Sequence, residues 1–134
     1  MKMHVFISHS AADRGLAREL GARLSEAGVQ AWTDENLFLG DNWGLEIGKA
    51  LEQSDAMVVL ISPEAAKSEW VRSEIAYALK SLRFENRLIP VQVRPTEGMP
   101  WVLEMFPAIV ADGDVAEMSR RVLERLQTTG GVAR

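Results

Sequence analysis

Six consecutive apolar residues, Ala56-Met-Val-Val-Leu-Ile61, constrain the fold more than any other stretch of this chain. An apolar run of strand length, without alternating polar side chains, is typical of a central parallel strand that is covered on both faces. Ser62 and Pro63 end the run, and proline suits the first turn of a helix. The run therefore predicts a parallel sheet with helices on both of its faces.

The rest of the chain supplies strands and helices in alternation. Further strands are expected at residues 5–7, 29–33, 88–93 and 106–110, and helices after Ser10, after Asp41, over residues 68–83 and after Asp114. Residues 94–105, with two prolines and a glycine, are expected to form a loop. This order, with short connections, predicts an open parallel sheet in a single α/β domain.

Local signals mark several element ends. Ser10 and Asp13 have the spacing of a capping box, with Asp in place of Glu. Gly28 stands where a helix C-cap favours glycine, and Asp114 is expected to cap the last helix. Pro90 cannot donate to a ladder, which leaves an edge-ward position or an interrupted pairing for its strand.

Length and charge limit the domain organisation and the partners. We expect one domain at residues 1–127, and a frayed tail or the start of a linker at 128–134. The net charge is -4 with both signs interleaved, which disfavours direct binding to nucleic acid or to an anionic membrane. No apolar run approaches 18 residues and no signal-peptide pattern opens the chain, so a cytoplasmic location is expected.

Metal and thiol chemistry are also disfavoured. The chain has no cysteine, which excludes disulfides, thiolate nucleophiles and cysteine-rich metal sites. Its two histidines, His4 and His9, are too few and too near the start of the chain to indicate a zinc site. No metal is therefore expected.

One carboxylate, Glu74, has an unusual position in the helix expected over residues 68–83. Val71 and Ile75 belong to the apolar stripe of that helix, and Glu74 lies on the shoulder of the stripe, roughly 80° away. A solvating glutamate suits the opposite face better, although a glutamate at a stripe margin is usually a surface residue. The helix alone thus indicates only that Glu74 borders a pocket.

In open parallel sheets, ligands bind outside the carboxyl ends of the strands. This rule gathers Ser8 and His9, Asp34, the residues around Trp43 and the start of the Glu74 helix around one crevice. There is no Gly-x-Gly-x-x-Gly motif, so the crevice is not an ordinary dinucleotide cradle.

Several motifs together resemble the Toll/interleukin-1 receptor (TIR) domain family, over almost the whole chain. They are Val5-Phe-Ile-Ser-His-Ser10 with Asp13 after it, Trp32-Thr-Asp-Glu-Asn-Leu37 followed by Gly40, Val58-Val-Leu-Ile-Ser-Pro63, and Ser68-Glu-Trp70 with Val71 and Glu74. Each motif alone is weak, but their order and spacing are specific.

The resemblance implies a flavodoxin-like five-stranded parallel sheet and places Leu37, Phe38, Leu39 and Gly40 in the family's BB loop. It also implies that Glu74 matches the glutamate of NAD-cleaving members. The expected function is that of an NAD+ glycohydrolase or ADP-ribosyl cyclase, active on self-assembly into a homo-oligomer or filament. A role in antiphage defence or cell death, and a sensor domain or second-messenger-binding partner, are further implications.

One carboxylate suffices for this chemistry. Glycosidases need a second carboxyl group to protonate an alkoxide leaving group. Nicotinamide leaves NAD+ as a neutral molecule, so NAD+ is a substrate that needs no such acid and no added cofactor. An ionised Glu74 can hydrogen-bond the ribose hydroxyls and stabilise the oxocarbenium-like charge. We expect partial solvent access, together with these hydroxyls, to keep Glu74 ionised.

The other candidate residues have two interpretations each. Trp43 either stacks on a ring of the substrate or anchors the core, and Asp34 either holds a ribose hydroxyl or caps a turn. Ser8 and His9 are candidates for phosphate contacts from the first loop, whereas Trp70 is expected to pack beside the pocket. The apolar residues of the BB loop form an assembly patch or fold back onto the core.

Two other functions compete with that of an enzyme. A non-enzymatic TIR adaptor would bind other TIR domains only, and nicotinamide release distinguishes it from the enzyme. A phospho-receiver domain needs acidic residues after strand one and an acceptor Asp after strand three. Those places hold Ser8, His9, Ser62 and Pro63, so the receiver interpretation is disfavoured.

Overall fold

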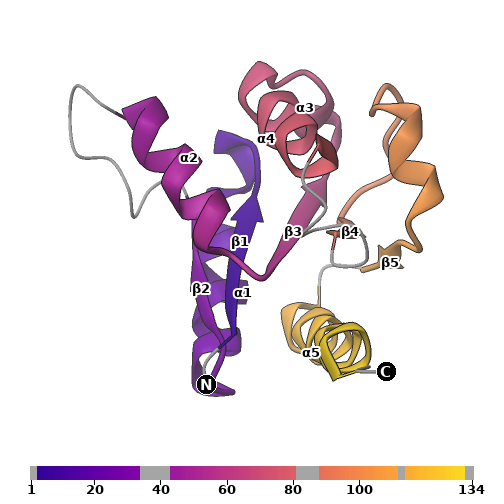
Figure 1. Cartoon of the computed structure of the whole chain (residues 1–134). Coiled ribbons are helices and arrows are strands. Elements are labelled where there is room, and N and C mark those ends of the chain that lie inside the picture. Colours follow the sequence, from indigo (N-terminus) through magenta and orange to yellow (C-terminus); the bar gives the residue numbers. More distant parts are fainter. Residues whose placement is uncertain (1–2, 34–42, 81–87, 112–113, 132–134) are drawn as a thin grey trace.

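The computed structural model is a five-stranded sheet with helices on both faces (Figure 1). It describes residues 3–33, 43–80, 88–111 and 114–131. Within these ranges, residues 43–47 and 128–131 are described by their backbone alone. All neighbouring strands are parallel, in the order β2-β1-β3-β4-β5. The predicted flavodoxin-like fold class is confirmed.

The strands lie close to their predicted positions. Their bounds are β1 His4–Ser8, β2 Gln30–Trp32, β3 Ala56–Ile61, β4 Leu88–Gln92 and β5 Ile109–Val110. Every residue of β3 is buried, as its continuous apolar sequence predicts. Register partners such as Ile7 with Val58 and Val58 with Ile89 place β3 between β1 and β4 at the centre of the sheet.

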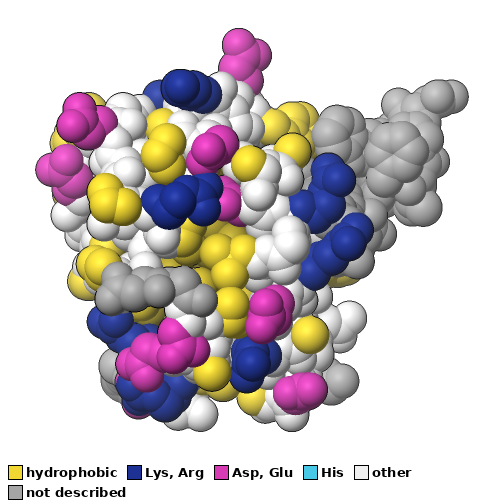
Figure 2. Space-filling model, turned by 180° about the vertical axis from the view of Figure 1, so that it is seen from behind, with side chains coloured by type: hydrophobic (Ala, Val, Ile, Leu, Met, Phe, Trp, Pro, Cys, Tyr) yellow, Lys and Arg dark blue, Asp and Glu magenta, His cyan; other side chains and the backbone are white. Residues whose placement is uncertain are grey.

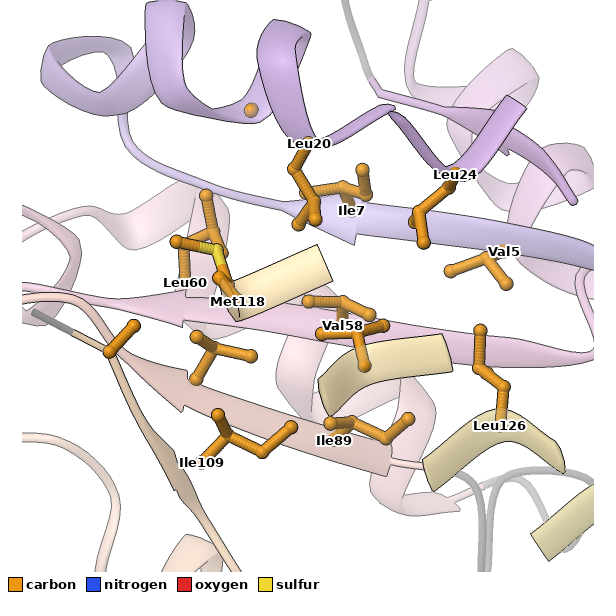
Figure 3. Packing of buried hydrophobic residues seen from close by; sticks show 14 of the residues in the cluster. Val5, Ile7, Leu20, Leu24, Val58, Leu60, Ile89, Ile109, Met118 and Leu126 are labelled. Carbon is orange, nitrogen blue, oxygen red and sulfur yellow. The ribbon is translucent and has the colours of Figure 1, made fainter. Parts of the chain in front are cut away.

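The helices complete two layers around the sheet. Their bounds are α1 Arg14–Glu26, α2 Trp43–Gln53, α3 Pro63–Ala66, α4 Glu69–Lys80 and α5 Val115–Gly131, with short 3-10 helices η1 at Ala11–Asp13 and η4 at Trp101–Met105. Side chains of α1 and α5 pack on one face with β-strand residues such as Val58, as Figure 3 shows. Helices α2, α3 and α4 cover the other face.

Several predicted element ends are confirmed. Gly28 has φ +93°, and the hydrogen bonds of its N–H to Ser25 and of the Val29 N–H to Leu24 form a glycine C-cap of α1. Asp114 Oδ1 accepts hydrogen bonds from the Ala116 and Glu117 N–H groups, 3.0 and 3.3 Å long, and so caps α5.

Strand β4 lies next to the edge of the sheet, where Pro90 can be accommodated. The edge strand β5 pairs with Val91 and Gln92 but not with Pro90, so the ladder on that side is interrupted at the proline. This arrangement fits the expected edge-ward position or interrupted pairing. Within the expected loop, Leu103 is buried in η4. Helix α5 continues to Gly131; the domain boundary and the frayed tail or linker expected from Thr128 stay predictions.

The described surface carries mixed charge. Figure 2 shows Lys and Arg side chains interspersed with Asp and Glu side chains on one face of the molecule. This matches the interleaving of the two signs in the sequence. Among the described residues, no helix combines the length and apolar character needed to cross a membrane.

Candidate active site

Glu74 lies on the inward face of α4. The helix begins at Glu69, and Ser68 Oγ accepts a hydrogen bond of 3.1 Å from the Val71 N–H group as an N-terminal cap. Val71, Ile75 and Ala78 bury the expected apolar stripe, and Glu74 is buried with them at 3% exposure. The expected partial solvent access of Glu74 is therefore wrong, because its carboxylate points into the protein.

Ser8 supplies a hydrogen bond to this carboxylate. Ser8 is the last residue of β1, whereas we expected it to lie in the loop that follows. Ser8 is 1% exposed, and its Oγ donates to Glu74 Oε1 over 2.5 Å. The structure thus joins the carboxyl end of β1 to α4 through two residues that the carboxyl-end rule had gathered into one crevice.

His9 follows Ser8 and is also buried. Its Nδ1 lies 2.7 Å from the carbonyl oxygen of Ser10. Because a carbonyl oxygen only accepts hydrogen bonds, His9 Nδ1 carries a proton and donates to it. A contact between His9 and phosphate stays a prediction.

The remaining predicted residues divide into two groups. Trp70 is partly buried and packs against the hydrophobic core on the α4 side of the sheet. That it lies beside a substrate pocket stays a prediction. Residues outside the described structure, or described only by their backbone, are Asp34, Leu37, Phe38, Leu39, Gly40 and Trp43. The roles predicted for this second group stay predictions.

A buried acidic residue that was not predicted for the site, Asp13, lies beside these residues. Its carboxylate accepts hydrogen bonds from Ser10 Oγ (3.0 Å), Ser62 Oγ (2.6 Å) and Arg94 Nη2 (2.8 Å). The predicted capping box is wrong, since the Ser10 side chain makes no cap hydrogen bond and bonds the Asp13 carboxylate instead. The carboxylate turns inward because three donors meet there.

The surroundings of Asp13 keep it ionised. Burial raises the pKa of Asp13, but the hydrogen bonds from Ser62, Arg94 and Ser10 outweigh burial and the net pKa lies below its usual value. Arg94 also pairs with Glu64 over 2.6 Å. That hydrogen bond lowers the pKa of Glu64, and together with Asp13 it raises the pKa of Arg94.

A sequence signal for this network did exist. Asp13 follows the first strand, and Arg94 follows the fourth, so parallel strands bring the opposite charges to one edge of the sheet. The Ser62-Pro63 pattern predicts only the start of a helix. Ser62 has two roles: its Oγ donates to Asp13, and it also caps α3 by accepting a hydrogen bond of 3.1 Å from the Ala65 N–H group.

A cavity of about 630 Å3 lies elsewhere at the same edge. Ile61 and Gln92 line it from the ends of β3 and β4, and Met99 and Leu103 line it from the following segment. None of Ser8, His9, Trp70 and Glu74 is among its lining residues. The cavity is therefore distinct from the Ser8–Glu74 pair.

The described residues contain no group of three or more His, Asp or Glu side chains arranged to hold a metal ion. The Ser8–Glu74 pair offers one carboxylate and one hydroxyl instead. Such a pair can hydrogen-bond sugar hydroxyls and stabilise a developing positive charge.

Comparison with known proteins identifies related sequences. A family model described as "TIR domain" matches residues 5–126. The chain is similar to a probable 2′ cyclic ADP-D-ribose synthase, TcpO, of Methanobrevibacter olleyae, with 27% identity over 65% of this chain and 26% of TcpO.

Two bacterial relatives carry similar names. The 2′ cyclic ADP-D-ribose synthase BtTIR of Bacteroides thetaiotaomicron is 33% identical over 52% of this chain and 25% of BtTIR. The 2′ cyclic ADP-D-ribose synthase AbTIR of Acinetobacter baumannii is 33% identical over 65% of this chain and 34% of AbTIR. The matched region thus spans about a quarter to a third of the length of these relatives.

Solved structures show the same fold. The TIR domain of the Toll-related receptor TRR-2 from Hydra magnipapillata superposes with a TM-score of 0.75 and 25% identity, over 90% of this chain and 94% of that chain. The TIR domains of the activated Roq1 resistosome superpose with a TM-score of 0.60 and 22% identity, over 98% of this chain and 86% of that chain.

Proposed function

Because the chain belongs to the TIR domain family, we propose that it cleaves the nicotinamide–ribose bond of NAD+ with Glu74 as its catalytic carboxylate. The observation that carries the proposal is the buried Glu74 carboxylate at the carboxyl end of β1, with Ser8 Oγ 2.5 Å from Oε1. The names of the three relatives, two 2′ cyclic ADP-D-ribose synthases and one probable 2′ cyclic ADP-D-ribose synthase, support NAD+ as the substrate.

The proposed reaction uses one carboxylate throughout. The bond between ribose C1′ and the nicotinamide nitrogen breaks, and nicotinamide leaves with the bonding electrons as a neutral molecule. Ionised Glu74 stabilises the positive charge that develops on the ribose. A hydroxyl group of the same molecule then bonds to C1′ and loses its proton, which gives a cyclic product. Attack by water instead gives ADP-ribose and a proton.

Self-assembly is part of the proposal. Glu74 is buried in the single chain, so a substrate ribose needs a rearrangement to reach it. Trp101 and Met105 on η4 are 75% and 72% exposed, and Val110 on the following strand β5 is also exposed. Exposed apolar side chains of this kind support contacts with other TIR domains. Association of several copies supplies the rearrangement in this proposal.

The same observations favour a second candidate, a non-enzymatic adaptor. In that case the exposed side chains of η4 and β5 bind other TIR domains, and the buried Ser8–Glu74 pair is a structural contact only. Turnover of NAD+ separates the two candidates.

The test incubates the concentrated chain with NAD+ and follows nicotinamide by chromatography and the second product by mass. We expect release of nicotinamide and a product lighter than ADP-ribose by one water. Glu74→Gln should lower the rate by at least about a hundredfold, because the negative charge that stabilises the ribose cation is lost. Glu69→Gln, on the exposed start of the same helix, is the matched control and should stay within about twofold.

Two results would contradict the proposal. If the wild type releases no nicotinamide while light scattering shows that it has assembled, the adaptor is favoured. If Glu74→Gln is as active as the wild type, the reaction uses another residue. An antiphage or cell-death role stays a prediction, and survival of phage-challenged cells that express the wild type or Glu74→Gln tests it.

A further inference from the structure

The polar network around Asp13 is linked to the Ser8–Glu74 pair through the Ser8–Ser10 segment, and the proposed reaction does not use it. Asp13 is 3% exposed and accepts three side-chain hydrogen bonds of 2.6 to 3.0 Å. One of these donors is the Arg94 guanidinium, so the network includes an ion pair with a buried carboxylate. Charge-assisted hydrogen bonds of this type fix geometry more strongly than neutral ones.

The three donors come from the ends of three adjacent central strands. Ser10 follows β1, Ser62 follows β3 and Arg94 follows β4. Main-chain hydrogen bonds join the same segments, from Val93 N to Ile61 O and from Asp13 N to Ser10 O, each 3.0 Å long. Asp13 therefore ties together the carboxyl edge of β1, β3 and β4.

This connection limits the movement of Ser8. The segment from Ser8 to Ser10 is held at its start by the pairing of β1 with β3 and at its end by Asp13. Between these points, His9 Nδ1 donates to the Ser10 carbonyl oxygen. The position of Ser8 Oγ relative to Glu74 thus depends on the β1–β3 pairing at one end of the Ser8–Ser10 segment and on the Ser10–Asp13 hydrogen bond at the other.

We propose that Asp13 is a positioning residue that holds the Ser8–Ser10 segment, so that Ser8 Oγ and Glu74 keep the geometry needed for NAD+ cleavage. The proposal rests on the proposed function of Glu74. It requires a carboxylate. Arg94 can only donate, so an Asn oxygen at position 13 would have to face Arg94, and the Asn amide N–H group would face the Ser10 and Ser62 hydroxyls, which would then accept where they now donate. Asn also removes the negative charge of the ion pair with Arg94.

The test compares Asp13→Asn with Asp55→Asn. Asp55 makes the equivalent control, because its carboxylate accepts a hydrogen bond of 2.9 Å from the His4 N–H at the opposite, amino edge of the sheet. With the folded fraction measured by circular dichroism, we expect Asp13→Asn to lower kcat about tenfold and to leave KM within about twofold, since misplaced catalytic groups slow chemistry more than binding. Asp55→Asn should leave both constants within about twofold.

A second variant keeps the test decisive if Asp13→Asn does not fold. Ser10→Ala removes one donor to Asp13 while the Arg94 and Ser62 contacts remain. It should lower kcat about threefold by the same argument, with KM again nearly unchanged. A loss of thermal stability with wild-type kcat in the folded fraction would overturn the proposal, because it would make the network purely structural.

A readout independent of turnover separates this inference from the proposed function. Amide hydrogen exchange of His9 and Ser10 should be at least about tenfold faster in Asp13→Asn than in the wild type, and unchanged in Asp55→Asn. If the wild type releases no nicotinamide, the proposed function fails and exchange alone decides whether Asp13 holds the segment. Unchanged exchange in Asp13→Asn would overturn the inference even if NAD+ is cleaved.

Discussion

Helices α4 and α5 cover opposite faces of one sheet. Of their two buried stripes, only that of α4 contains an acidic side chain. The inward stripe of α5 is Val115, Met118, Val122 and Leu126, with Ser119 bonded to its own helix through the Ala116 carbonyl. The stripe of α4 contains Glu74 among its apolar residues. The buried stripe of α5 is thus apolar apart from Ser119, whereas the buried stripe of α4 also holds a carboxylate.

The difference carries a cost in stability. An ionised carboxylate loses several kcal/mol of hydration on burial unless hydrogen bonds replace the water. Ser8 provides one such bond to Glu74, from the neighbouring strand β1. A helix selected for packing alone would carry an apolar residue at this place, as α5 does, so the carboxylate indicates a function that offsets the cost.

Met118→Ala should have the largest effect, and it tests the apolar layer. Met118 is fully buried between α5 and the sheet (Figure 3), and its truncation should lower the free energy of unfolding by about 2–5 kcal/mol through lost contacts and a cavity. Urea unfolding measures the change. The rate of NAD+ cleavage per folded molecule should not change, and a large loss of that rate would contradict the separation of the two layers.

Ser8→Ala tests the cost of the carboxylate in the other layer. Without the Ser8 hydroxyl, buried Glu74 loses a donor, and the free energy of unfolding should fall by about 1–3 kcal/mol. The double variant Ser8→Ala with Glu74→Met removes both polar partners, so it should be at least as stable as the wild type and inactive towards NAD+.

Ser119→Ala is the control on α5, since it removes a buried hydroxyl whose partner lies in its own helix. Its effect should be below about 1 kcal/mol in the same urea experiment. If the double variant is less stable than Ser8→Ala alone, Glu74 stabilises the fold through other contacts, and the comparison of the two layers fails.

The smallest expected effect is a dependence on pH that comes from the polar edge of the sheet. The folded pKa of Asp13 is lowered from 3.8, because hydrogen bonds from Ser62, Arg94 and Ser10 outweigh the opposing effect of burial. The unfolded chain therefore binds the proton more readily in acid. The contribution of Asp13 to stability is present above the unfolded pKa and is lost as the pH falls through the folded pKa.

The measurement is urea unfolding of wild type and Asp13→Asn at a series of pH values. The difference in unfolding free energy should be constant from about pH 7 to about pH 5 and should shrink as the pH falls below the unfolded pKa. The difference between wild type and Met118→Ala should show no such decrease, because no titrating group is removed. A difference for Asp13→Asn that grows in acid would contradict the sign of the shift.

The fold was largely predictable because its strongest elements carry redundant local signals. Strand β3 was predicted with its observed ends, since six apolar residues stop at Ser62-Pro63. The α5 helix begins after its predicted cap, Asp114, and buries the predicted stripe. Pro90 was harder to place, because the effect of a missing donor depends on how far the neighbouring strand extends, and β5 is formed by residues far along the chain.

The candidate site was predictable only in part. Helical spacing placed Glu74 near the apolar stripe, and the carboxyl-end rule brought Ser8 towards it. Periodicity could not show that the carboxylate is buried, because the partner that accommodates it comes from β1, 66 residues away. Asp13 was assigned to a local cap for the same reason, as two of its three donors, Ser62 and Arg94, lie 49 and 81 residues along the chain.

The strand order also dictates when the chain can fold during synthesis. Val5 pairs with Ala56, so the longest ladder of β1 forms only after β3 has left the ribosome. Until then β1 has only the short strand β2 as a partner. Contacts so distant along the chain slow folding and leave an apolar strand exposed in the meantime. We therefore expect a chaperone to have its largest effect before β3 is synthesised, when the apolar strand β1 is still exposed.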